Sequence, residues 1–325
     1  MCVLHRKDIE YRDYFVQNKR HILWTDVSKG IVITLMVIGH TSIPGWLSNW
    51  IWSFHMPFFF IISALFTSWD KGTIYSFIIR KVKLLLIPFV VYSIINWGIL
   101  APILGFTYPD YAVHILRTGW GGIALWFIPV FFISLTICRC INIKYAYLVS
   151  AILLFVSLIL SHSNFNLPWA MSVTPFATSL MVFIRKFQRE IKHFLSCPNT
   201  KMLTIAALGG AIPSLIVSQY FRLDMCSNHI IPIIPILIGI VGGCSTVITS
   251  SILLANHFAR VSKFIGSIGR NTYEIMALSQ VIIMSINYYY PLPAIAKYML
   301  MIVALIAVVK LRHIIEGKFA KQEVI

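Results

Sequence analysis

Long apolar runs recur along nearly the whole chain and are separated by short polar segments. Ten such runs can be marked, at about residues 27–43, 46–68, 84–104, 121–137, 145–161, 168–184, 202–219, 230–254, 265–289 and 293–311. Runs of this length can cross a bilayer core as helices, whereas the strands of a membrane barrel would alternate apolar and polar residues. The pattern predicts an all-α, polytopic membrane protein with about ten transmembrane helices around an internal cavity.

The polar ends of this pattern define the expected domain limits. We expect a cytoplasmic N-terminal segment over residues 1–22, a transmembrane domain over 23–315 and a cytoplasmic tail over 316–325, with no separate soluble domain. The first 22 residues lack a short apolar core before a small-residue cleavage site, so no cleavable signal peptide is predicted. Proline occurs inside several runs, which membrane helices tolerate where neighbours satisfy the freed carbonyls.

Composition supports the membrane prediction. Apolar residues make up 58% of the 325 residues and charged residues only 12%, where a soluble domain has about 25% charged residues. This excludes a cytosolic enzyme, a disulfide-stapled secreted domain and a disordered chain. The six cysteines are scattered, and Cys138 and Cys140 form a CxC rather than a zinc-type CxxC. We expect six free thiols and no metal site.

The basic charge is distributed unevenly about the expected spans. The formal net charge is +16, which in a soluble protein would suggest nucleic acid. Here we expect membrane lipid as the partner and no nucleic acid. With ten alternating spans and an N-terminus inside, 24 Lys and Arg residues lie on the cytoplasmic side, and Arg117, Arg222 and Lys297 lie outside. The positive-inside rule therefore predicts that both termini are cytoplasmic.

Ionisable residues share one face of the first span. Lys29 and His40 are eleven residues apart, which is about three helical turns and about 16 Å along the axis. Asp26 lies on nearly the same stripe, three residues before Lys29. Such groups usually face a cavity or a partner. From spacing alone, Lys29 could equally be a snorkelling anchor and His40 a hydrogen-bonded residue between helices.

The second span carries His55 in the stretch Ser53-Phe54-His55-Met56-Pro57-Phe58-Phe59-Phe60. His55 lies about nine residues in from the outer side, so His40 and His55 should lie at comparable depths on adjacent antiparallel helices. Together they indicate a polar site in the outer half of the membrane. A stacked pair without a catalytic role is the alternative, and the phenylalanine run favours packing over ligand binding.

Three further features carry possible chemistry. The loop Arg80-Lys81-Val82-Lys83 is either a positive-inside anchor or a clamp for phosphates, which Arg and Lys both bind. Trp126, in Leu125-Trp126-Phe127, is either an interfacial residue or part of a site. Glu274 is the one acidic residue clearly inside an expected span, where it should pair with a basic group or lie at the cytoplasmic rim.

Taken together, the order of these motifs resembles acyltransferase family three. The motifs are Asp26-x-x-Lys29-Gly30 with Gly39-His40, the stretch around His55, Arg80-x-x-Lys83-x-x-x-x-Pro88 and Leu125-Trp126-Phe127. The pattern is most similar to the branch described as fucose 4-O-acetylase-like. The resemblance implies a bacterial inner-membrane protein of ten or so helices that moves an acyl group, here acetyl, from cytosolic acyl-CoA to a hydroxyl of a cell-surface or lipid-linked glycan.

The resemblance also implies site residues. Lys29, Arg80 and Lys83 match basic positions of the family and would hold the phosphates of the acyl-CoA, although many members have Arg at the first and third. Ala64 and Gln280 stand where many members have glycine and histidine. We assign Asp26, Trp126 and Glu274 to substrate binding. Homo-oligomerisation stays open.

Acyl transfer to a hydroxyl needs a base, and His40 suits that role or a transient acyl-carrying role, with His55 orienting the acceptor or sharing the proton transfer. The main alternative function is a secondary transporter or exporter of a glycan or small metabolite, because kinking prolines and buried ionisable residues also fit a carrier. A family member acting only as an assembly partner is a further alternative.

Overall fold

The computed structural model describes residues 23–120, 123–163, 165–196, 199–290, 292–293, 296–307 and 309–310. The fold is 84% helical, and in these segments the only β-pairing is an isolated bridge between Asp224 and His229. The all-α prediction is therefore confirmed. The expected N-terminal segment over 1–22 and the tail over 316–325 lie outside the described residues.

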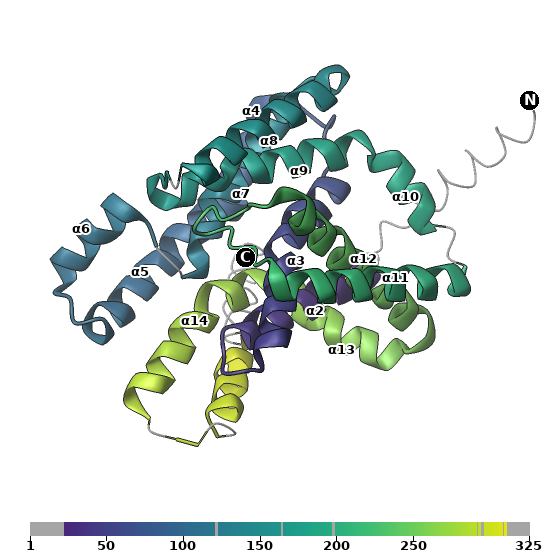
Figure 1. The fold of residues 1–325 in the computed structure, drawn as a ribbon. Coiled ribbons are helices and arrows are strands. Elements are labelled where there is room, and N and C mark those ends of the chain that lie inside the picture. The colour runs from purple at the N-terminus through teal and green to yellow at the C-terminus, as the bar shows by residue number, and fades with distance from the viewer. Residues whose placement is uncertain are drawn as a thin grey trace, which may run out of the picture.

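Three helices form the middle of the molecule (Figure 1). They are α2 (Leu23–Gly39), α3 (Gly45–Phe66) and α12 (Ile233–His257), and each contacts the other two. Helix α9 (Thr174–Lys186) packs on α3, α11 (Thr200–Tyr220) packs on α12, and α13 (Ala259–Arg270) packs on α2. In each of α3 and α12, 61% of the most apolar 18-residue stretch is buried, as expected for helices surrounded by other helices.

The remaining helices surround this centre. They are α4 (Ile74–Lys81), continued through a π-helical turn (Val82–Leu86) into α5 (Ile87–Ile103), then α6 (Tyr108–Thr118), α7 (Phe127–Cys140), α8 (Ala146–His162), α10 (Gln188–Ser196) and α14 (Thr272–Tyr289). A last apolar helix covers Ala296–Ala307. Three long helices, over 74–103, 143–162 and 200–220, are mostly exposed. Only 17–22% of the apolar 18-residue stretch of each is buried, so these helices present apolar faces outward.

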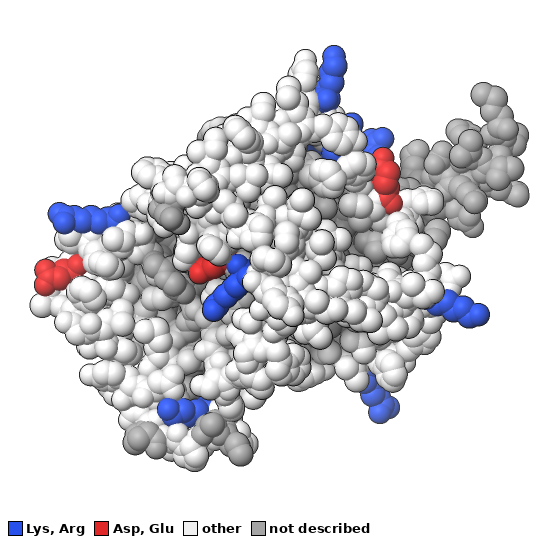
Figure 2. All heavy atoms as spheres, viewed as in Figure 1, with Lys and Arg blue, Asp and Glu red and all other residues white. Residues whose placement is uncertain are grey.

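Within the described part of the chain, five helices are long and apolar enough to cross a membrane: 45–66, 74–103, 143–162, 200–220 and 233–257. The expected count of about ten spans is therefore not confirmed, although each of the ten predicted runs contains helix. The predicted run 265–289 is broken at Asn271, between α13 and α14. Asn271 has a non-helical φ of −110°, and its side chain donates to the carbonyl of Ser267 at 2.7 Å. Figure 2 shows a face on which charged side chains are few and most of the surface is uncharged, as expected for a membrane protein.

Glycines allow the closest helix crossings. A Cβ on Gly269 would lie 1.8 Å from the carbonyl oxygen of Asp26, and one on Gly30 would lie 2.2 Å from that of Ile265. Helices α2 and α13 therefore cross at backbone contact, as small residues permit in membrane bundles. This crossing brings the end of α13 against the beginning of α2, where the basic and acidic residues of the first span lie.

Candidate active site

His40 lies just beyond the end of α2. Its backbone N–H donates to Val37 at 3.2 Å, which tightens the last turn of the helix. Its Nδ1 lies 2.8 Å from the carbonyl oxygen of Met36. A carbonyl only accepts, so this contact assigns the proton to Nδ1 and leaves Nε2 with a lone pair. His40 is half-buried, and its ring lines three separate hollows in the molecule.

His55 repeats this arrangement inside α3. Its Nδ1 lies 2.9 Å from the carbonyl oxygen of Ile51, so its Nε2 also carries the lone pair. The side chain is only 3% exposed. His55 in α3 and His40 just after α2 thus have the same nitrogen free to accept a proton, but His40 is the more accessible of the two.

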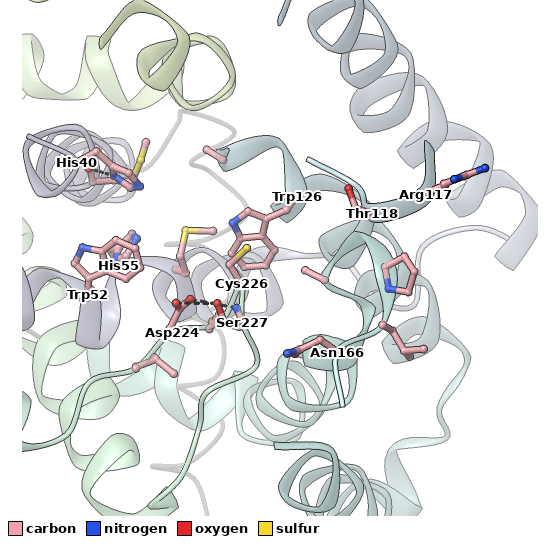
Figure 3. A pocket seen from close by; sticks show the side chains of 18 residues that line it. His40, Trp52, His55, Arg117, Thr118, Trp126, Asn166, Asp224, Cys226 and Ser227 are labelled. Carbon is pink, nitrogen blue, oxygen red and sulfur yellow. Dashed lines mark hydrogen bonds between the residues drawn. The ribbon is translucent and has the colours of Figure 1, made fainter. Parts of the chain in front are cut away.

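The structure brings the two histidines together around a tryptophan (Figure 3). The ring centroids of His40 and His55 are 6.4 Å apart, and Trp52 lies 5.5 Å from each. The Arg222 guanidinium lies over the Trp52 ring at 4.6 Å, a distance typical of cation–π contacts. Trp52 therefore contacts both histidine rings and a guanidinium.

A cavity of about 500 Å³ opens beside the pair. Besides His40, Trp52 and His55, its lining comes from α6, from the 3-10 turn Ala124–Trp126 before α7 and from two connecting segments, which contribute Arg117, Thr118, Trp126, Asn166, Asp224, Cys226 and Ser227 among others. Figure 3 shows the histidines on one side of the cavity, Arg117, Thr118 and Asn166 on the other, and Trp126 between them. This volume lies within the range of small-molecule sites.

One wall of the cavity is a short hairpin between α11 and α12. Asp224 and His229 exchange backbone hydrogen bonds of 3.1 and 2.8 Å, and the Asp224 carboxylate accepts from the Ser227 N–H at 3.2 Å and hydroxyl at 3.0 Å. Burial, and then the nearby Asp224 carboxylate, raise the pKa of the Cys226 thiol to about 12. The thiol therefore stays protonated at neutral pH and is a poor nucleophile.

Lys29, Asp26 and Arg270 form a second polar group, at the other end of α2. Lys29 Nζ lies 2.8 Å from one oxygen of the fully buried Asp26 carboxylate, and Arg270 Nη1 lies 3.6 Å from the other. Lys29 also lines a small hollow of about 160 Å³ with Ile33, Leu85 and others. The sequence indicated the Asp26–Lys29 spacing but not Arg270, which is brought in by the α2–α13 crossing.

The stripe from Lys29 to His40 is continuous along α2. Lys29 and Ile33 line the small hollow, while Met36 and His40 line the large cavity. These four positions follow the i, i+4, i+7, i+11 spacing of one helix face. One face of α2 therefore lines both hollows, the small one near Lys29 and the large one near His40.

Arg80 and Lys83 lie on exposed positions of α4 and the π-helical turn. The Arg80 guanidinium carbon is 5.9 Å from the centre of the Phe77 ring. Neither residue is among those lining the small hollow beside Lys29. The structure thus places these two cations at the surface and does not bring their side chains into that hollow.

Trp126 and Glu274 are both buried. Trp126 lines the large cavity, whereas Glu274 lies in the first turn of α14. Gln280, farther along α14, accepts a hydrogen bond from the backbone N–H of Ala124, just before Trp126. Gln280 therefore holds the start of the segment that carries Trp126 into the cavity.

The cavity includes polar residues that sequence reasoning missed, notably Trp52, Arg117, Asn166 and Asp224. Most lie in or beside connecting segments with no motif spacing of their own. The available signal was the small set of basic residues expected outside, because Arg117 lines the cavity and Arg222 lies in the segment between α11 and α12.

Comparison with known proteins identifies one match. A family model described as an acyltransferase domain matches residues 22–310, which includes every candidate site residue. No curated protein and no solved structure matches the chain.

Proposed function

The chain belongs to acyltransferase family three, and from this membership we propose that it is an integral-membrane O-acyltransferase acting on a glycan. The donor is cytosolic acyl-CoA, with acetyl-CoA as the first candidate. The acceptor is a hydroxyl of a cell-surface or lipid-linked sugar. The observation that carries this proposal is the cavity in which His40 and His55, each with Nε2 free to accept a proton, lie beside polar and aromatic side chains.

The proposed chemistry follows from the assigned tautomers. Nε2 of His40 takes the proton of the acceptor hydroxyl as its oxygen attacks the thioester carbonyl. The C–S bond then breaks, the acyl group stays on the sugar oxygen, and the proton passes to the CoA sulfur. His55, being less accessible, orients the acceptor or shares the proton transfer. His40 could also carry the acyl group transiently, because Nε2 is a nucleophile in the same tautomer.

The donor enters from the Lys29 end of α2 in this proposal. Lys29, Arg80 and Lys83 supply positive charge for the phosphates of CoA, and Asp26 holds Lys29 in place through their 2.8 Å ion pair. The axial distance of about 16 Å from Lys29 to His40 suits an extended pantetheine arm. Trp126 and Glu274 are assigned to substrate binding, Trp126 on the acceptor side of the cavity.

The same proposal places the protein in a bacterial inner membrane with both termini in the cytoplasm. The uneven distribution of Lys and Arg supports this orientation. The histidine end of α2 then lies in the outer half of the membrane, where a sugar can approach from outside while the donor stays inside.

The proposal is tested by incubating the purified protein with radiolabelled acetyl-CoA and p-nitrophenyl glycosides. The measurement is the amount of labelled acetyl transferred to the glycoside. His40→Gln keeps a polar side chain but removes the basic nitrogen, so we expect transfer to fall by about 10²–10⁴. His162→Gln, at an exposed histidine at the end of α8, is the matched control and should behave as wild type.

Near-normal transfer by His40→Gln would show that His40 is a structural residue. Wild-type protein that consumes no acetyl-CoA with any acceptor, yet moves a glycan across vesicles, would favour the transporter.

A further inference from the structure

We infer that the hairpin over residues 224–229 is the acceptor-recognition wall of the cavity, with the Asp224 carboxylate accepting hydrogen bonds from sugar hydroxyls beside His40. This inference rests on the proposed function and deepens it. It makes Asp224 a specificity-determining residue and makes the acceptor a sugar that presents at least one hydroxyl to a carboxylate while another faces His40.

The hairpin is built as a firm support. Its two backbone hydrogen bonds pair Asp224 with His229, and Asn228 takes a left-handed φ of 54°, which asparagine tolerates better than most residues. After the hairpin, the Ile230 N–H donates to the Ser161 hydroxyl at 3.3 Å, which ties it to the end of α8. Because the hairpin is fixed by its own backbone hydrogen bonds and by its contact with α8, the Asp224 carboxylate would lose little conformational freedom when a ligand binds.

The Asp224 carboxylate keeps acceptor capacity for a ligand. An ionised carboxylate has about four lone-pair positions, and Ser227 occupies one on each oxygen. Asp224 is half-buried and lines the same cavity as His40 and His55. Hydrogen bonds to a charged acceptor are about twice as strong as neutral ones, so the remaining positions favour a ligand rich in hydroxyl donors.

The other side chains around the cavity also fit a sugar. The rings of Trp52 and Trp126 offer flat apolar surface, and Figure 3 shows the Trp126 ring nitrogen turned toward the histidine side of the cavity. Asn166 adds a side chain that both donates and accepts. A carboxylate, an amide and two indoles can satisfy several hydroxyls and an apolar sugar face at once, whereas a purely apolar ligand would offer no hydrogen-bond donor to the remaining lone pairs of Asp224.

Asp224→Asn tests the inference because it removes charge while keeping shape and one acceptor oxygen. With labelled acetyl-CoA and a panel of p-nitrophenyl fucoside, galactoside and mannoside, we expect the KM for the best glycoside to rise about tenfold or more. The KM for acetyl-CoA should change much less, because Asp224 contacts the acceptor and not the donor in this inference. Asp110→Asn is the matched control, because Asp110 also binds a hydroxyl, that of Thr107 at 2.5 Å, but does not line the cavity.

Ser227→Ala separates sugar binding from support of the hairpin. It deletes the hydroxyl that donates to Asp224 but leaves the carboxylate, so the glycoside KM should change less than in Asp224→Asn. Equal increases in both variants would mean that Asp224 only holds the hairpin, and an unchanged glycoside KM in Asp224→Asn would remove it from the site. Either result overturns the inference while leaving acyl transfer intact.

A wild-type protein that hydrolyses acetyl-CoA in a His40-dependent way but uses none of the glycosides would overturn the assignment of a sugar hydroxyl as ligand. Absence of any acetyl-CoA consumption would instead contradict the proposed function itself.

Discussion

At the scale of single residues, the candidate site is prepared by hydrogen bonds to the carbonyls of its own helices. His40 and His55 each direct Nδ1 to the carbonyl four residues earlier, at 2.8 and 2.9 Å. Each bond orients a ring and selects its tautomer without a carboxylate partner. Lys29 is oriented in a similarly local way by Asp26, three residues before it. The chemical state of these residues therefore depends mainly on their own helices.

The proposed donor site gives a prediction for Lys83. Its ammonium is exposed and would contact phosphate about equally in the ground and transition states, so Lys83→Ala should raise the KM for acetyl-CoA several-fold and change kcat little. Steady-state kinetics with varied acetyl-CoA measure both constants.

Lys201→Ala is the control for charge alone, because Lys201 is another exposed basic residue expected on the cytoplasmic side. An unchanged KM for acetyl-CoA in Lys83→Ala would exclude Lys83 from the donor site.

At the scale of helices, two crossings organise the molecule. Helix α13 contacts α2 through Gly269 and Gly30, and α11 contacts α12 where a Cβ on Gly210 would lie 2.7 Å from the carbonyl oxygen of Gly242. The first crossing brings Arg270 to Asp26, and the second supports the helices on both sides of the 224–229 hairpin. A glycine contact between α2 and α13 thus positions Arg270 beside Asp26, and a glycine contact between α11 and α12 positions the hairpin that joins them.

The α2–α13 crossing gives a stability prediction. In Gly269→Ala the added methyl would collide with backbone at Asp26, which cannot move aside as a flexible side chain can. We expect a loss of about 1–3 kcal/mol, typical of overpacked contacts, seen as a lower thermal midpoint in detergent.

Gly209→Ala is the matched control, because a Cβ there meets nothing within 4 Å. Alanine favours helix over glycine by about 1 kcal/mol, so this variant should be as stable as wild type or slightly more so. A thermal midpoint for Gly269→Ala equal to that of Gly209→Ala would contradict the close crossing.

At the scale of the whole molecule, the buried centre and the apolar exterior fit a bundle surrounded by lipid. Helices α3 and α12 are largely covered, whereas most of the apolar surface of 74–103, 143–162 and 200–220 faces outward. Without lipid, such extended apolar surface would be unusual for a monomeric protein. The bundle places the His40 cavity and the Lys29 hollow at different points along α2, and a membrane enzyme with a donor and an acceptor on opposite sides needs such an arrangement.

The proposed orientation predicts which surface positions an impermeant reagent reaches. In a background without native cysteines, an impermeant maleimide on intact cells should label Asp110→Cys in α6 and leave Arg189→Cys in α10 unlabelled. Both positions are exposed, so both should react after the membrane is permeabilised. Labelling of Arg189→Cys in intact cells would contradict the proposed topology.

Local patterns in the sequence determined a large part of this picture. The apolar runs predicted the helices, and the eleven-residue spacing placed Lys29 and His40 on one face of α2. The short connection from α2 to α3 brought His55 near His40. These features follow from a helical repeat of 3.6 residues and from short loops, so they depend on residues close together in the chain.

Contacts between distant segments were decided only by the tertiary structure. These contacts join residues more than 100 positions apart in the chain. Arg270 approaches Asp26, Arg222 lies over Trp52, and Asp224 and Asn166 line the same cavity as His40 and His55. The exposed positions of Arg80 and Lys83 were likewise visible only in the tertiary structure. Helical periodicity identifies the residues on one face of a helix, but it does not identify the helix that packs against that face. That depends on how closely two backbones approach, which here is set by glycines whose effect appears only when the helices are packed.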